Sequence, residues 1–60
     1  MIKFEIFRDI RGQYRWRLKA ANGEIIAVSE GYVYKLSAKN SVAGIKSLAP
    51  HAIVVDLTTF

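Results

Sequence analysis

The sequence lacks cysteine altogether and contains only one histidine, His51, and one proline, Pro50. Without cysteine there is no disulfide framework and no thiolate metal site, and a single histidine excludes a multi-histidine metal centre. A chain of 60 residues buries little surface and usually needs a disulfide, a metal or a partner subunit for stability. Association with another chain is therefore the predicted source of extra burial.

Long apolar runs are missing as well. Residues 2–8 alternate apolar and charged side chains, unlike a secretory leader or a membrane span, and so predict a cytoplasmic protein. Acidic residues are few, with five Asp and Glu against nine Lys and Arg, for a net charge of +4. This charge permits attraction to nucleic acid but does not by itself indicate it. At this length residues 1–60 form one domain.

The first half of the chain predicts three antiparallel strands. Residues 2–8 and 13–20 alternate with period two, which places Phe4, Tyr14 and Trp16 on an inward face and leaves Phe7 out of the pattern. Residues 9–12 have the composition of a turn. The pair Asn22-Gly23 favours a two-residue type I′ turn, in which both residues take positive φ, leading to a strand at 24–29.

The second half predicts a helix and a final strand. Ser37 is the expected N-cap of a helix that runs to about Leu48, with an apolar stripe formed by Ala38, Val42, Ile45 and Ala49. Gly44 interrupts this helix, either for close packing or as a tolerated destabilising residue. Residues 52–57 are nearly all apolar and rich in β-branched side chains, so they predict a strand buried inside a sheet. The fold class is α+β with the order βββαβ.

Two segments resemble the YegP-like family of uncharacterised proteins. They are the hairpin region GQYRWRLKAANGEIIAVSEGY at residues 12–32 and the helix segment GIKSL at residues 44–48, where Leu48 stands in place of the family's usual valine. The resemblance implies a βββαβ unit that occurs as two tandem copies or as two subunits, joined in one continuous sheet with exchanged C-terminal strands. It thus implies a homodimer for this chain, with Ile53, Val54 and Val55 in the exchanged strand, but it implies no activity.

Residues with catalytic potential are sparse, and the sequence predicts no enzyme. His51 follows the helix-ending proline and has no second histidine to work with. The five carboxylates are scattered, and the four glycines do not form a phosphate-binding loop, so no cofactor or small-molecule substrate is expected. Glu30, beside Ser29 and Gly31, is either a bend residue, which is the favoured interpretation, or part of a site formed at a dimer axis.

One surface feature has a defined binding mechanism. Arg15, Arg17 and Lys19 form a basic row on the polar side of the second predicted strand, where they could follow a phosphate backbone while Tyr32 or Tyr34 stacks a base. A sheet with a helix on one side also needs a polar outer face for solubility. Two functions therefore remain open: a structural or protein-interaction dimer, and a nucleic-acid-binding protein that uses this row.

Overall fold

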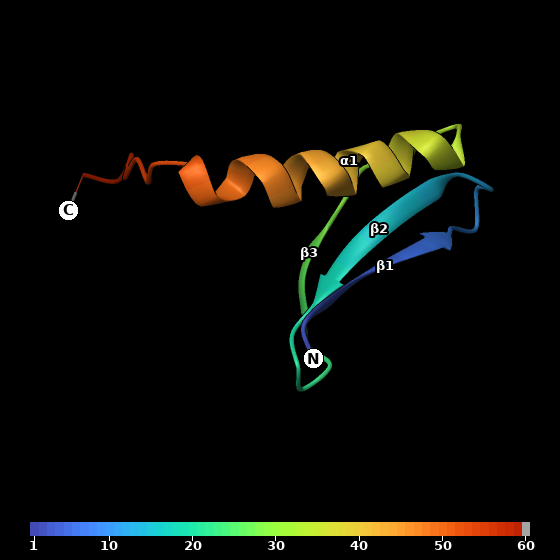
Figure 1. The fold of residues 1–60 in the computed structure, drawn as a ribbon, viewed down its shortest axis with the longest axis horizontal. Helices are drawn as coiled ribbons and strands as arrows, with labels where there is room; N and C mark the ends of the chain where they lie inside the picture. The colour runs from blue at the N-terminus through green and yellow to red at the C-terminus, as the bar shows by residue number, and fades with distance from the viewer. Residues whose placement is uncertain (60) are drawn as a thin grey trace.

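Residues 1–59 are described by the structure, a computed structural model, and they form an antiparallel sheet with one helix across one face (Figure 1). The sheet order is β1-β2-β3. The elements are β1 (Lys3–Arg8), β2 (Tyr14–Lys19), β3 (Ile25–Val28), the helix α1 (Lys35–Leu48) and a short 3₁₀ turn, η1 (Ala49–His51). The predicted α+β class, the three strands and the helix are confirmed.

The β1–β2 hairpin is closed by Asp9. Its carboxylate oxygen Oδ1 accepts the backbone N–H groups of Arg11 and Gln13, both at 2.9 Å. This side-chain bonding satisfies two backbone donors that the tight turn leaves without a ladder partner. The pairing register then sets Glu5 opposite Arg17. The turn predicted at residues 9–12 is therefore correct, and it fixes which side chains of β1 and β2 share a face.

The β2–β3 connection differs from the predicted type I′ turn. Gly23 has φ +90, but no residue other than glycine takes positive φ in the described chain. Hydrogen bonds from Gly23 N to Ala20 O and from Ala20 N to Glu24 O define a three-residue loop with a glycine bulge. Asn22 keeps negative φ because one left-handed residue is enough to close this longer loop.

Trp16 anchors the sheet to the helix. It is 7% exposed, and its ring meets Phe4 edge to face at 5.4 Å. Its indole Nε1–H donates to the hydroxyl oxygen of Ser41 on α1 at 2.9 Å, and the Tyr32 hydroxyl donates to the same oxygen at 3.1 Å. The inward assignment of the aromatic side chains is confirmed for this pair, and Ser41 fixes the helix to the sheet through two hydrogen bonds.

Helix α1 begins three residues before the prediction. Tyr34 is its N-cap with extended backbone angles and no side-chain capping bond, so Ser37 lies inside the helix and does not cap it. The helix starts three residues after Tyr32, whose backbone pairs with that of Tyr14 in an isolated bridge. A Cβ atom placed on Gly44 would meet nothing within 4 Å, so this glycine serves no close approach within the chain.

The apolar stripe of α1 is closed at one end only. Ala38 is fully buried, whereas Val42 and Ile45 are half-buried and Ala49 is exposed. Figure 1 shows the reason, because the sheet diverges from the helix toward the C-terminal end of α1. The helix therefore seals the sheet near its own N-terminus and leaves a wedge near its C-terminus.

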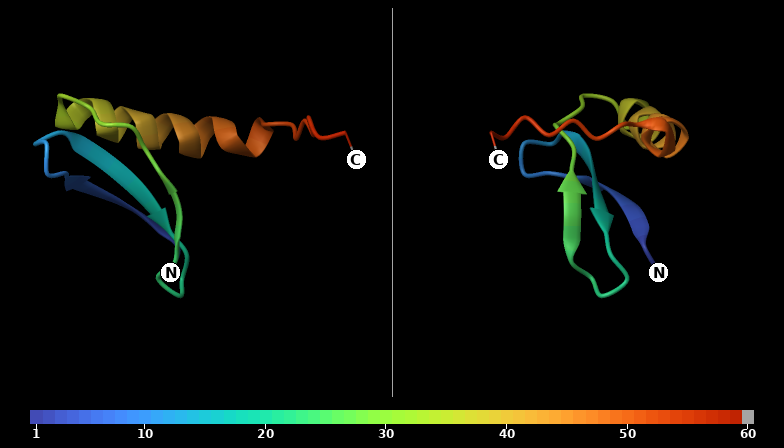
Figure 2. Two further views of the ribbon diagram at one scale, coloured as in Figure 1. Left: turned by 180° about the vertical axis from the view of Figure 1, so that it is seen from behind. Right: turned by 90° about the vertical axis from the view of Figure 1, so that its left-hand side faces the viewer.

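The fourth strand predicted at residues 52–57 is absent from the single chain. After η1 the backbone is extended at Ala52, but residues 52–57 form no ladder with β1, β2 or β3. The chain leaves along the direction of the helix axis and moves away from its own sheet (Figure 1 and Figure 2). An apolar, β-branched segment takes an extended backbone readily, but it becomes a strand only beside another strand.

Candidate functional site

The outer face of the sheet carries the basic row. Helix α1 covers the opposite face, so the outer face has no covering element within residues 1–59 (Figure 2). Period-two alternation and the β1–β2 register bring charged side chains of both strands onto this surface. We call it the basic face: Lys3, Glu5, Arg15, Arg17 and Lys19. Four cations and one carboxylate leave it with a net positive charge.

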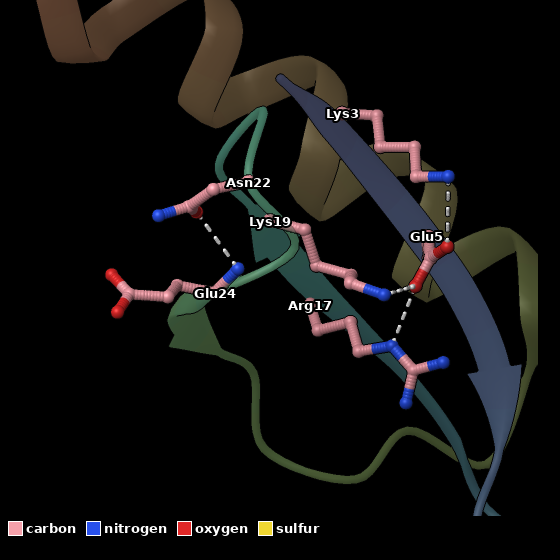
Figure 3. Close-up of polar contacts among 6 residues, drawn as sticks. All are labelled: Lys3, Glu5, Arg17, Lys19, Asn22 and Glu24. Atoms are coloured by element: carbon pink, nitrogen blue, oxygen red, sulfur yellow. Dashed lines mark hydrogen bonds and ion pairs between the residues drawn. The ribbon is translucent and has the colours of Figure 1, made fainter. Parts of the chain in front are cut away.

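Glu5 is the centre of the basic face. Its carboxylate lies 2.7 Å from Arg17 Nε, 3.3 Å from Lys3 Nζ and 3.7 Å from Lys19 Nζ (Figure 3). The hydrogen bond from Arg17, followed by the nearby lysine ammonium groups, holds the pKa of Glu5 below its usual range although partial burial opposes this. One carboxylate therefore organises three cations without neutralising them.

Arg17 is held in a defined orientation. Its guanidinium carbon lies 4.6 Å from the centroid of the Phe7 ring, a cation–π geometry, while Nε donates to Glu5. In Figure 3 the two terminal nitrogens of Arg17 point away from Glu5. No acceptor within residues 1–59 bonds these terminal nitrogens, so they present two N–H donors in the fork geometry that matches a phosphate or a carboxylate.

Arg15 has a structural partner. Its Nε and one terminal nitrogen donate to the backbone carbonyl of Ser29 at 2.9 and 2.6 Å. Ser29 is itself buried, and its hydroxyl accepts the backbone N–H of Trp16 at 2.9 Å in place of a ladder carbonyl. The segment after β3 is thus held against β2 through Ser29, and the Glu30 side chain is exposed there.

The predicted row therefore divides into two environments. Arg17 and Lys19 meet at Glu5, whereas Arg15 is bonded to the backbone carbonyl of Ser29. Tyr32 is half-buried with its hydroxyl bonded to the helix, so it is not placed to stack a base on the outer face. Tyr34 is exposed at the start of α1.

Three residues of this surface, Lys3, Glu5 and Phe7, were not predicted from the sequence. They alternate along β1 in the same way as the basic row alternates along β2. Pairing the two strands across the turn at residues 9–12 would have placed them on the same face, because hairpin register follows from the loop. The missing information was the register and not the residue pattern.

A second surface of interest is apolar. A groove of about 790 Å³ opens between the diverging sheet and the C-terminal half of α1. Its apolar lining comes from Ile2, Phe4, Leu18, Val42, Ile45, Ala49 and Pro50. Beyond the groove, the predicted interface residues Ile53, Val54 and Val55 are 83%, 96% and 65% exposed. The groove and the segment that carries Ile53, Val54 and Val55 both consist of side chains that ordinarily lie in a core.

Groups with possible catalytic or metal-binding chemistry remain dispersed. His51 is exposed in η1, and residues 1–59 contain no group of three His, Cys, Asp or Glu side chains arranged to hold a metal. The described helices are too short or too polar to cross a membrane. The arrangement therefore offers surfaces for binding, with cations on one and aliphatic side chains on the other.

Solved structures share this architecture. A solution structure from Haloferax volcanii superposes with a TM-score of 0.84 at 43% identity, covering 92% of this chain and 93% of that one. A second solution structure, of protein ATU0232 from Agrobacterium tumefaciens, gives a TM-score of 0.80 at 51% identity, covering 98% and 95%. The class is an α+β module with three antiparallel strands and one helix.

The family follows from the sequence comparisons. A domain of unknown function, DUF1508, matches residues 9–56. The UPF0339 protein YegP of Yersinia pestis is 49% identical over 54 residues, which cover 90% of this chain but 48% of that protein. The chain belongs to this DUF1508 family of UPF0339 proteins, which includes YegP and has no assigned function. The predicted family resemblance is confirmed.

Proposed function

We propose that this chain works as a non-enzymatic, homodimeric interaction module in the cytoplasm, and that two copies exchange their C-terminal segments to form one continuous sheet. The observation that carries the proposal is the extended apolar segment at residues 52–57, which leaves its own sheet unpaired. An exposed strand of aliphatic residues is an aggregation hazard unless another strand pairs with it. A second copy of the chain supplies such a strand in a one-to-one ratio.

The accessible surface of the single chain supports association with a second copy. The single chain has 5134 Å² of accessible surface, whereas a compact monomer of 6.8 kDa has about 4,000 Å². The excess is about 1,100 Å² per chain, and two chains together would bury about 2,200 Å², which lies in the range of obligate homodimers. The radius of gyration, 13.5 Å, also exceeds the roughly 10 Å of a compact chain of this length.

The edge of β3 is the proposed acceptor of the exchanged segment. Its residues Ile25, Ile26 and Val28 are each more than half exposed, and β3 contains no charged residue. The other edge strand, β1, carries Lys3 and Glu5 among its residues, and charges along an edge oppose strand addition. A segment that is apolar on both faces therefore fits β3 better. The remaining part of the partner would cover the groove beneath α1.

The length of one relative agrees with a paired unit. YegP of Yersinia pestis is about twice as long as the region that this chain matches in it. Such a length accommodates two units in one polypeptide, in which intramolecular pairing would replace association of two chains. For the present chain the same pairing requires a second molecule.

Two further parts of the proposal concern activity and location. A binding role without catalysis is favoured by the dispersed carboxylates and by the exposed position of His51 in η1. A cytoplasmic site of action is favoured by the alternating residues 2–8, most of which form the structural strand β1. Fractionation of cells that express the tagged protein tests the location directly.

Light scattering on a dilution series tests the dimer, and isotope-filtered nuclear Overhauser spectroscopy tests the exchange. In a mixed sample of labelled and unlabelled chains, we expect intermolecular contacts between the methyl groups of Val54 and those of Ile25 or Ile26. A folded monomer at micromolar concentration would refute the dimer. A dimer whose residue 54 contacts only its own chain would refute the exchange.

A further inference from the structure

We propose that the basic face binds single-stranded nucleic acid along its phosphate backbone, with Arg17 as the principal contact. This inference goes beyond the dimer and does not depend on it, because every residue of the basic face comes from β1 and β2 of one chain. It rests on the orientation of Arg17, on the spacing of the cations and on the uncovered sheet surface.

The Arg17 side chain is preorganised for a bidentate anion. Glu5 fixes Nε at 2.7 Å, and the Phe7 ring fixes the plane of the guanidinium at 4.6 Å. Both terminal nitrogens point away from this support (Figure 3). A guanidinium held on one edge and on one face loses little conformational entropy when its open edge binds a phosphate. A freely moving surface arginine lacks this advantage.

The spacing of the cations favours a polymer over an isolated anion. Arg15, Arg17 and Lys19 follow one another at alternate positions of β2, which places neighbouring side chains about 6.7 Å apart along one face. Lys3 adds a cation from the adjacent strand, opposite Lys19 in the register. Repeated charges along a line complement the repeated charges of a phosphate backbone, whose binding releases counterions.

The shape of the surface favours a single strand over a duplex. Proteins that read the major groove insert a helix or a β-ribbon into it, whereas this face is a sheet surface without a protruding element (Figure 2). Positively charged surfaces of this kind bind single strands, whose backbone then follows the line of cations. Sequence preference should be weak, because the contacts are to phosphate.

The test is a fluorescence-anisotropy titration of the full chain with a labelled oligothymidine of about 15 nucleotides, at about 50 and 200 mM salt. We expect binding that weakens with salt, and Arg17→Gln should lower the affinity about tenfold and reduce the salt slope by about 0.7 to 1. The matched control is Lys39→Gln, which removes the same charge from an exposed position of α1. It should leave the affinity within about twofold.

Glu5→Gln supplies a second, opposite signature. Glutamine keeps a side-chain oxygen that can accept the Nε–H of Arg17, so the support of Arg17 is retained while the negative charge is lost. With this charge removed, Arg17, Lys3 and Lys19 attract phosphate more strongly, so the variant should bind more tightly and with a steeper salt slope. Circular dichroism melts of all variants confirm that each remains folded. If Glu5→Gln is folded and binds less tightly than the parent, the proposed role of the basic face is wrong.

Other outcomes also refute the proposal. Absence of binding at low salt would refute the proposal outright. Equal losses of affinity in Arg17→Gln and Lys39→Gln would also refute it, because net charge and not the basic face would then account for binding. Tighter binding of a duplex of the same length would refute the preference for single strands. Equal binding of polyglutamate of matched charge, or of vesicles containing anionic lipid, would refute the specificity for nucleic acid and show a general anion surface.

Discussion

The two ends of helix α1 differ sharply. Around its first half, Trp16, Tyr32 and Ser41 form a closed polar and aromatic contact, and Ala38 is fully buried. Around its second half the sheet diverges, the groove opens and residues 52–57 lie unpaired. The first region is completed by segments of one chain. The second has core-forming residues without neighbours, which supports the proposal that another molecule completes this half of the module.

The largest expected effect is at the open end. Val54→Asp would place a charge in the proposed exchanged strand, where burial of an unpaired carboxylate and loss of apolar contact both oppose association. We expect the dissociation constant of the dimer to rise at least about a hundredfold, equivalent to about 3 kcal/mol. Analytical ultracentrifugation measures it.

The matched control for this change is Ile10→Asp, at a fully exposed position in the β1–β2 turn. The same substitution there should leave association unchanged. If Val54→Asp and Ile10→Asp behave alike, the open end has no partner and the contrast between the two ends loses its meaning.

A second prediction concerns the closed end. Ala38 is fully buried where α1 contacts the sheet, so Ala38→Leu would insert a larger side chain into a closed space. Overpacking should destabilise the fold by about 1–3 kcal/mol, measured as a lower urea midpoint. Ala43→Leu, at an exposed position of the same helix, is the control and should change stability by less than about 0.5 kcal/mol. Equal tolerance of both would mean that this end is also loosely packed.

A third prediction tests the polar contact at the closed end. Ser41→Ala removes the acceptor for both the Trp16 indole N–H and the Tyr32 hydroxyl. Leaving these donors without a partner should cost about 1–2 kcal/mol in the free energy of unfolding. Ser47→Ala, on an exposed part of α1, should be close to neutral. Trp16 fluorescence should also shift in the first variant only.

The smallest effect is expected on the outer face, as a function of pH. The pKa of Glu5 is lowered in the folded protein, chiefly by Arg17, so the carboxylate stabilises the fold above its ordinary pKa. This stabilisation is lost as the pH falls through the lowered value. Parent and Glu5→Gln should therefore differ in melting temperature at neutral pH and converge in acid. Glu24→Gln, at an exposed turn residue, is the control and should match the parent in melting temperature at both pH values.

Local patterns predicted the two faces of the β1–β2 hairpin well. Alternation along β1 and β2 identified the inward position of Trp16 and the outward position of Arg17, because period two reports directly on the two faces of a strand. The same patterns missed the loop type at residues 20–24, where a three-residue loop with a glycine bulge replaces the type I′ turn. Both loops satisfy the same Asn-Gly composition, and the pairing of the flanking strands decides between them.

The candidate sites were predicted less completely. The sequence identified Arg15, Arg17 and Lys19 as a basic row but not Glu5 and Phe7, which orient Arg17. It also identified residues 52–57 as strand-forming, although in the single chain they have no strand beside them. In both cases the missing information was a contact between segments distant in the chain.

The sequence alone thus determined the family, the α+β class, the order of the three strands and the helix, and the two faces of the hairpin. These follow from local periodicity and from backbone preferences, which act within a few residues. Only the tertiary structure decided the divergence of the sheet from α1, the support of Arg17 by Glu5 and Phe7, and the direction of residues 52–57. Register and packing angle set these features, and both depend on contacts between segments that no local pattern records.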